Sequence, residues 1–381
     1  MSKRAVVGSE RSTAPADTAN PSPVVDDDEE MPRVDVSPRR AIGLALFVLL
    51  SLVGLYLLLP QLAGLEDTWN RINEGKPEWI FAALVFEVAS LAGYIAMFRS
   101  TCVPPEGPVR ERIDWSESYQ ITMAGVAATR IFAAGGAGGV ALTAWALRRA
   151  GLDGREVATR LFAFLALLYG VYMAALVIGG VGLRVNLFPG EAPFGMTVVP
   201  AIFAGVVIAL FLAMTLVPDD FERRLGGWAR GSRRIRLARW LTYLATVPAI
   251  VSRGMRVALS HLRHPSPGLF GAIAWWAFNV AVLWAAFHAF GEAPPLAVVV
   301  MGYFVGMLGN LLPLPGGIGG VDGGMIGAFL AFGVPGGLAI VAVLVYRGFA
   351  FWLPTIPGAV AYLQLRRTVN RWRLERRPAA A

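Results

Sequence analysis

The chain has 381 residues, of which 56% are hydrophobic and 16% charged, and its formal net charge is +8. Soluble domains carry about a quarter charged residues, so this composition excludes an ordinary soluble domain. Repeated apolar runs of about 20 residues instead predict a polytopic helical membrane protein. The positive charge comes almost wholly from arginines beside those runs, which favours a topology signal over nucleic-acid binding.

The small number of metal-ligating and reactive side chains excludes further classes. Cys102 is the only cysteine, and the three histidines lack metal-ligand spacing. We therefore expect no intramolecular disulfide, no metal and no cofactor. No nucleophile–base pair or nucleotide-binding glycine motif is evident, so we expect no enzymatic activity.

The N-terminal segment 1–37 is rich in Ser, Thr, Pro and Asp, lacks an apolar core and predicts a disordered cytoplasmic tail. After it, the chain contains apolar runs long enough to span a bilayer as single helices. These six predicted spans are 41–60, 79–98, 161–183, 196–216, 269–290 and 338–364.

Two further apolar runs, 116–149 and 295–334, are interrupted by glycine clusters that suit a turn rather than a straight helix. Each predicts a re-entrant hairpin made of a broken helix. Such irregular backbone is tolerated at membrane depth only where protein or a water-filled cavity surrounds it. The predicted fold class is thus all-α, with about six full transmembrane helices plus two re-entrant hairpins.

Arginine distribution predicts the orientation of these elements. The basic region 217–267, which contains an amphipathic stretch ending near Leu262, is the strongest cytoplasmic marker; it could also lie on anionic lipid headgroups. Positive-inside logic also places 99–115, 148–160 and both termini, including the basic tail 368–381, in the cytoplasm of a plasma-membrane protein. The arginine-poor loops expected outside are 184–195, 291–294 and 333–337.

The two hairpins resemble each other in sequence. Five glycines of the segment 124–139 match five glycines of 305–320 in one register: Gly125, Gly135, Gly136, Gly138 and Gly139 against Gly306, Gly316, Gly317, Gly319 and Gly320. Together with the order of the spans, this predicts that one membrane domain, 38–367, consists of the inverted halves 41–183 and 196–364. Inverted repeats place ligand sites near the membrane midplane.

Four ionisable residues lie at bilayer depth, where each costs about 2.5–3.5 kcal/mol and needs an explanation. They are Glu87, Arg130, Asp322 and Arg347. One interpretation is a hydrophilic cavity in which Arg130 and Arg347 hold an anionic headgroup, because a guanidinium donates two parallel hydrogen bonds to phosphate. The other is a structural ion pair, such as Asp322 with Arg347, that only ties helices together.

Several uncharged residues have two interpretations as well. Asn279, Asn310 and Tyr346 could line the cavity, although hydrogen bonding between helices is the simpler role. Glycines at four-residue spacing form two small faces that favour close helix packing. One face contains Gly316, Gly320 and Gly324, and the other contains Gly319, Gly323 and Gly327.

The motif "LPLPGGIGGVDGG", followed about 25 residues later by "YRGFAFWLPTIPG", resembles the lysylphosphatidylglycerol synthase transmembrane family, also called the flippase-like domain. The resemblance covers roughly 41–367. The first-half segment "RIFAAGGAGG" departs from it, because Ala133 and Ala134 stand where a proline-bearing turn would strengthen the match. The positions carried over are Pro315, Gly316, Gly317, Gly319, Asp322, Tyr346 and Arg347.

The resemblance implies a domain that moves lipids between leaflets. We expect no soluble synthase domain after the last span, which removes the main reason to assume a lysylated substrate. The first hypothesis is a flippase for an anionic or polyprenyl-linked lipid, with membrane lipids as partners. The alternatives are a small-anion transporter driven by protons through Glu87 or Asp322, and a scaffold that recruits a lipid-modifying enzyme through 217–267.

Overall fold

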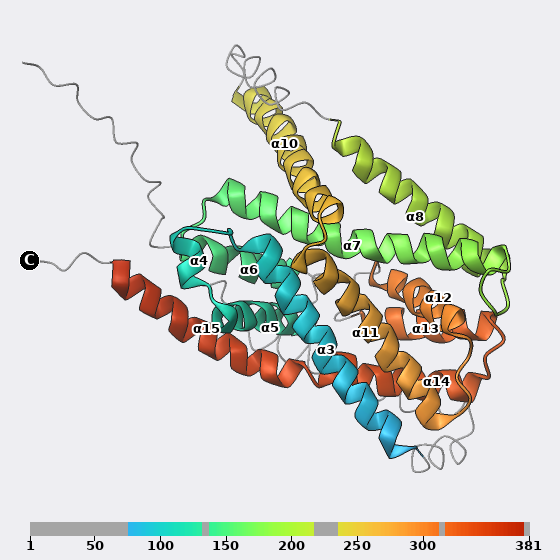
Figure 1. The fold of residues 1–381 in the computed structure, drawn as a ribbon. Helices are drawn as coiled ribbons and strands as arrows, with labels where there is room; N and C mark the ends of the chain where they lie inside the picture. Colours follow the sequence, from blue (N-terminus) through green and yellow to red (C-terminus); the bar gives the residue numbers. More distant parts are fainter. Residues whose placement is uncertain (1–74, 132–136, 217–234, 312–316, 377–381) are drawn as a thin grey trace, which may run out of the picture.

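The computed structural model describes residues 75–131, 137–216, 235–311 and 317–376 (Figure 1). The predicted tail 1–37, the first predicted span 41–60 and the motif residues Pro315 and Gly316 lie outside these ranges. All regular structure within them is helical, which confirms the predicted class. The elements are α3 Pro77–Cys102, α4 Pro108–Arg112, α5 Trp115–Ile131, α6 Ala137–Ala150, α7 Gly154–Arg184, α8 Phe194–Met214, α10 Ile235–Arg263, α11 Pro267–Phe290, α12 Leu296–Met307, the 3₁₀ turn Leu308–Leu311, α13 Gly320–Ala331, α14 Gly336–Arg347, the π-helical turn Gly348–Trp352 and α15 Thr355–Arg376.

Five segments of the described chain are long and apolar enough to cross a membrane. They are α3, α7, α8, α11 and the nearly continuous helix from Gly336 to Glu375. These coincide with five of the six predicted spans, and the sixth, 41–60, lies outside the described residues. The chain is therefore an integral membrane protein. Local signals set the helix starts: Asp153 caps α7 through two backbone N–H groups, and Ser266 caps α11.

Both glycine-rich runs form the predicted broken hairpins. Helices α5 and α6 pack against each other, as do α12 and α13. A Cβ added at Gly139 would lie 2.5 Å from the Gly125 carbonyl oxygen, and one at Gly324 would lie 3.0 Å from the Gly306 carbonyl oxygen. Each hairpin therefore closes through a glycine contact, and one partner of each contact, Gly125 in the first hairpin and Gly306 in the second, is a matching position of the repeat.

The main helix contacts join the first part of the chain to the second. The most extensive helix contact joins α3 to α11, the corresponding spans of the two halves (Figure 1). Each hairpin also packs on the last span of the other half: α5 lies along α15, and α12 lies along α7. This reciprocal exchange is what an inverted repeat produces, because a pseudo-two-fold axis maps each contact onto its counterpart.

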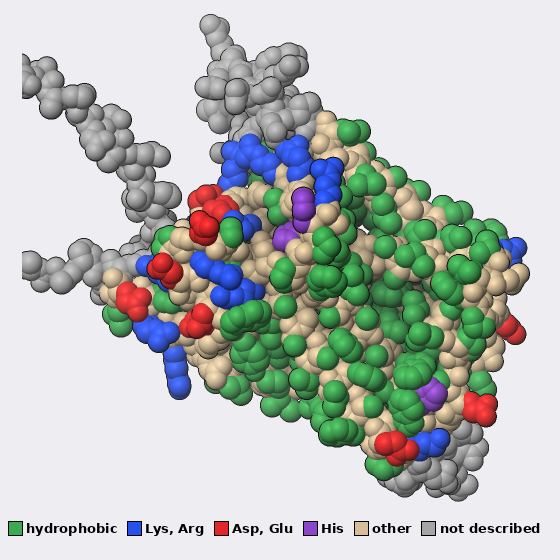
Figure 2. All heavy atoms as spheres, viewed as in Figure 1, with side chains coloured by type: hydrophobic (Ala, Val, Ile, Leu, Met, Phe, Trp, Pro, Cys, Tyr) green, Lys and Arg blue, Asp and Glu red, His purple; other side chains and the backbone are tan. Residues whose placement is uncertain are grey.

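The loops gather at two ends of the molecule. At one end, the Arg112 guanidinium donates to the Ala150 carbonyl oxygen at 3.1 Å, so the entry and exit of the first hairpin meet. At the other end, Gly333 lies against Glu191, and Gly190 lies against Val298. The three arginine-poor loops therefore share one end, as the sequence predicts. Figure 2 shows charged side chains concentrated at the ends and a broad apolar belt between them.

The structure adds local detail to the second hairpin and to the last helix. Helix α13 begins at Gly320, because Gly317 and Gly319 have φ angles of 68° and 82°, which an α-helix does not adopt. A Cβ added at Gly319, Gly323 or Gly327 would meet no neighbouring element within 4 Å, so this face does not support close packing. Lastly, α15 extends to Arg376, so the described part of the basic segment 368–381 is helical.

Candidate functional site

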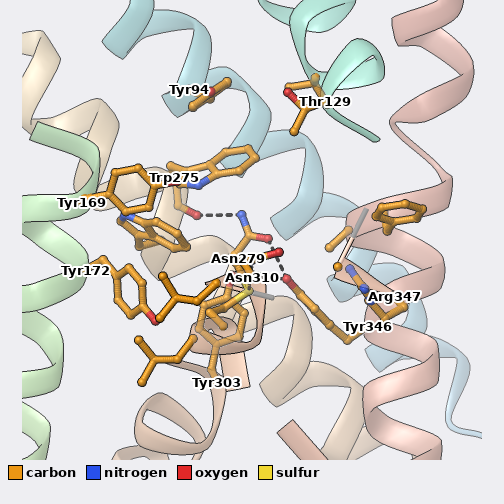
Figure 3. Close-up of a pocket in the computed structure, with 18 of the residues that line it drawn as sticks. Tyr94, Thr129, Tyr169, Tyr172, Trp275, Asn279, Tyr303, Asn310, Tyr346 and Arg347 are labelled. Carbon is orange, nitrogen blue, oxygen red and sulfur yellow. Dashed lines mark hydrogen bonds between the residues drawn. The ribbon is translucent and has the colours of Figure 1, made fainter. Parts of the chain in front are cut away.

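A cavity of about 460 Å³ lies where the ends of the two broken hairpins approach each other. Thr129 and Arg130 of α5 line it from the first hairpin, and Asn310 and Gly317 line it from the second. Figure 3 shows Thr129 and Asn310 among the lining residues. Side chains of α3, α7, α8, α11, α12 and the α14–α15 span also line the cavity. The cavity therefore lies between the two halves, where inverted-repeat folds place their ligands.

Arg347 reaches this cavity from the end of α14 and pairs with Asp322. Its Nε donates to one carboxylate oxygen, and its Nη2 lies 3.4 Å from the other. Asp322 also accepts the Gly319 backbone N–H at 3.0 Å and so caps α13. Both side chains are largely buried, with 14% and 8% exposed. The predicted pair thus exists, and its arginine still lines the cavity.

Arg130 satisfies a backbone carbonyl that a proline leaves without its helical donor. Pro354 has no N–H, so it cannot bond to the carbonyl of Ala350 four residues earlier. The Arg130 Nη2 donates to that carbonyl oxygen at 2.7 Å, and its Nη1 lies 3.4 Å from the Thr355 hydroxyl. An arginine of the first half thereby satisfies a backbone group exposed by a proline of the second half.

The two arginines share one neighbour. The Arg130 and Arg347 guanidinium carbons lie 5.4 and 4.8 Å from the centre of the Phe351 ring. Phe351 belongs to the π-helical turn Gly348–Trp352, a rare element that recurs at functional sites. The turn therefore brings two positive charges to the same side of the cavity. No third cation lines it among the described residues.

Asn279 and Tyr346 form the hydrogen bonds between helices that the sequence suggested. The Asn279 Nδ2 donates to the Ser90 hydroxyl at 2.6 Å. The Tyr346 hydroxyl lies 3.3 Å from the Asn279 Oδ1 (Figure 3). Tyr303 extends this network, with its hydroxyl 3.2 Å from that of Tyr346. Asn310 differs: it is exposed, and its Nδ2 donates to the Met307 sulfur, three residues earlier, at 3.8 Å.

Glu87 lies behind the cavity wall and does not line it. Only 1% of this residue is exposed, and neither carboxylate oxygen accepts a hydrogen bond from the described residues. Arg130 is close enough to attract its charge. Within the described ranges, no group of three His, Cys, Asp or Glu side chains is arranged to hold a metal.

Aromatic side chains make up a part of the cavity that sequence reasoning missed. Five rings follow one another in contact from α3 through α11 to α7: Tyr94, Trp275, Trp276, Tyr172 and Tyr169. We call this group the aromatic wall. Apart from the three-residue spacing of Tyr169 and Tyr172, no sequence signal distinguishes these rings from ordinary packing residues.

The hydrogen bond from Arg130 to the Ala350 carbonyl should contribute to the stability of the protein. Arg130→Ala leaves the Ala350 carbonyl without its donor, and an unsatisfied buried group costs about 1–3 kcal/mol. We expect a lower thermal unfolding midpoint in detergent. In a Pro354→Ala background the backbone N–H is restored, so the same substitution should cost markedly less. Equal losses in both backgrounds would show that the carbonyl contact contributes nothing to stability.

Comparison with known proteins gives one family and several relatives. Residues 40–358 match the family model described as the lysylphosphatidylglycerol synthase TM region. A UPF0104 membrane protein of Methanothermobacter thermautotrophicus is 24% identical over 338 residues, which cover 83% of this chain and 94% of the relative.

Shorter matches are more similar in sequence. One to a UPF0104 membrane protein of Methanothermobacter thermautotrophicus is 40% identical over 86 residues, or 22% of this chain and 26% of the relative. Another, to a UPF0104 membrane protein of Methanocaldococcus jannaschii, is 29% identical over 104 residues and spans 27% of this chain and 31% of the relative. These two alignments thus span less than a third of the relatives they match.

Proposed function

Because the chain belongs to the lysylphosphatidylglycerol synthase TM region family, we propose that it is a lipid flippase. Its cargo is an anionic phospholipid or a polyprenyl-linked lipid. The headgroup passes through the cavity between the two halves while the acyl chains stay in the bilayer. The protein acts in the plasma membrane with its arginine-rich end in the cytoplasm.

The observation that carries this proposal is the pair of arginines in a cavity between broken helices. Arg130 and Arg347 line the same side of it. An anionic phosphate in a space of low polarity needs donors that stay charged, and arginine supplies them in a planar fork. A volume of about 460 Å³ suits a headgroup.

The edge of the cavity favours a lipid over a small soluble anion. Tyr169 of α7 and Phe203 of α8 line the cavity and are 45% and 40% exposed. Helix α8 is among the least buried of the spans, as a lipid-facing helix is. A site that reaches the lipid-facing surface allows acyl chains to remain outside while the headgroup enters, whereas a soluble anion needs an enclosed site.

The test is leaflet transfer by the purified protein in liposomes. Fluorescently labelled phosphatidylglycerol is placed in both leaflets, and reduction by membrane-impermeant dithionite reports the fraction that becomes accessible. We expect the protein to make the inner-leaflet fraction accessible, whereas protein-free liposomes retain about half of the signal. Arg184→Ala is the matched control, because Arg184 is exposed at the end of α7, outside the cavity. The same assay is run with a labelled polyprenyl phosphate. If the wild-type protein leaves the inner-leaflet fraction of both probes as protected from dithionite as in protein-free liposomes, the proposal is contradicted.

A further inference from the structure

We propose that the headgroup bound in this cavity is a phosphate joined to a polyol or sugar, rather than a bare phosphate or an aminoacylated headgroup. This inference rests on the proposed function and names the substrate class of the same site. Its basis is the division of the cavity into two unlike sides. Figure 3 shows Tyr169, Tyr172 and Trp275 on one side and Arg347 on the other.

The aromatic wall is a continuous surface rather than a set of separate rings. The centres of Tyr94 and Trp275 lie 4.4 Å apart, those of Trp276 and Tyr172 lie 5.3 Å apart, and Trp275 joins the two pairs. A sugar ring has an apolar face of C–H bonds that packs well on such a surface. A bare phosphate has no apolar face and gains nothing from it.

Part of the wall is held rigidly by the backbone. The Trp276 Nε1 donates to the Leu168 carbonyl oxygen at 2.8 Å, and the Tyr172 hydroxyl donates to the Phe304 carbonyl oxygen at 2.6 Å. These bonds fix the two rings in place before any ligand enters. A preformed surface binds with a smaller loss of side-chain entropy than a mobile one.

The other polar atoms of the wall are available to a ligand. The Tyr94 and Tyr169 hydroxyls and the Trp275 Nε1 bond to no described protein group, although all three residues line the cavity. Asn310 and Thr129 add an amide and a hydroxyl. A polyol or sugar presents several hydroxyl groups at its rim, and each needs a donor or an acceptor when it leaves water.

The charges disfavour an aminoacylated headgroup. No carboxylate is among the described residues that line the cavity. Asp322 is already held by Arg347, and Glu87 lies behind the wall. An ammonium group would therefore meet two arginines and no counter-charge. The rings also pack on one another as a surface, whereas a cation–π cage needs rings around an open space.

Binding by the full chain in detergent tests this assignment. The probes share one chain length: dihexanoyl phosphatidylinositol, dihexanoyl phosphatidic acid and dihexanoyl lysyl-phosphatidylglycerol, with free glucose 1-phosphate as the soluble form. We expect the inositol lipid to bind at least about tenfold more tightly than phosphatidic acid. Trp275→Ala should remove that preference and leave affinity for phosphatidic acid unchanged, which also shows that the variant is folded.

Two further variants make the result interpretable. Tyr94→Phe removes one hydroxyl without removing its ring and should reduce the preference in part. Trp115→Ala removes a tryptophan that is 60% exposed outside the cavity and should change nothing. Equal binding of phosphatidylinositol and phosphatidic acid, or tighter binding of the lysyl lipid, overturns the inference and leaves the flippase proposal standing.

The remaining outcomes concern the flippase proposal itself. Free glucose 1-phosphate that binds as tightly as the inositol lipid supports the headgroup chemistry and contradicts a lipid cargo. Absence of binding to every anionic probe overturns both proposals.

Discussion

Arg347→Ala is expected to destabilise the second hairpin strongly. The substitution leaves the Asp322 carboxylate, only 8% exposed, without the guanidinium that neutralises it. Removing one partner of a buried ion pair costs about 3–5 kcal/mol, because the remaining charge stays desolvated. Asp322 also caps α13, so its displacement would loosen the start of that helix. Thermal unfolding in detergent should show a large fall in the midpoint.

The double variant Asp322→Ala/Arg347→Ala is the matched comparison. It removes both charges, so no unpaired carboxylate is left in the buried position. We therefore expect it to recover most of the stability that Arg347→Ala loses. If the double variant is no more stable than Arg347→Ala, the loss does not come from the unpaired carboxylate, and the pair is not what holds α13 against α14.

Gly271→Ala is expected to have the second large effect. A Cβ at this position would lie 2.5 Å from the Gly93 carbonyl oxygen and 2.7 Å from the Met97 backbone nitrogen. Backbone atoms cannot rotate away, so α3 and α11 must separate along their whole contact. Overpacking of this kind costs about 1–3 kcal/mol. The thermal unfolding midpoint should fall.

Gly170→Ala in α7 is the control for that experiment. A Cβ there would meet no neighbouring element within 4 Å. Alanine is the better helix former by about 1 kcal/mol, so this variant should be neutral or slightly stabilised. Equal behaviour of Gly271→Ala and Gly170→Ala would contradict the close crossing of α3 and α11.

The sequence predicted the features that depend on local pattern. Spans follow from apolar length, and the broken hairpins follow from glycines that suit turns. The Asp322–Arg347 pair followed from the cost of an unpaired charge at bilayer depth. These features need no knowledge of which helices become neighbours. The pattern does not reveal that Gly317 and Gly319 adopt positive φ, which sets the start of α13 at Gly320.

The remaining features of the site depend on contacts between distant segments. The bond from Arg130 to the Ala350 carbonyl exists because α5 packs on α15 of the other half. The aromatic wall combines rings from three helices that are far apart in the chain. Tyrosine and tryptophan are ordinary constituents of apolar spans, so their composition alone did not single them out.

The central claim is that a lipid headgroup crosses through the cavity beside Arg347, and leaflet transfer by the double variant Asp322→Ala/Arg347→Ala tests it most directly. This variant is expected to be folded but to lack one of the two cations that bind the headgroup. Wild-type protein in liposomes should expose inner-leaflet phosphatidylglycerol to dithionite, and the folded double variant should leave it nearly as protected as protein-free liposomes do. Transfer at the wild-type rate by the double variant would contradict the claim.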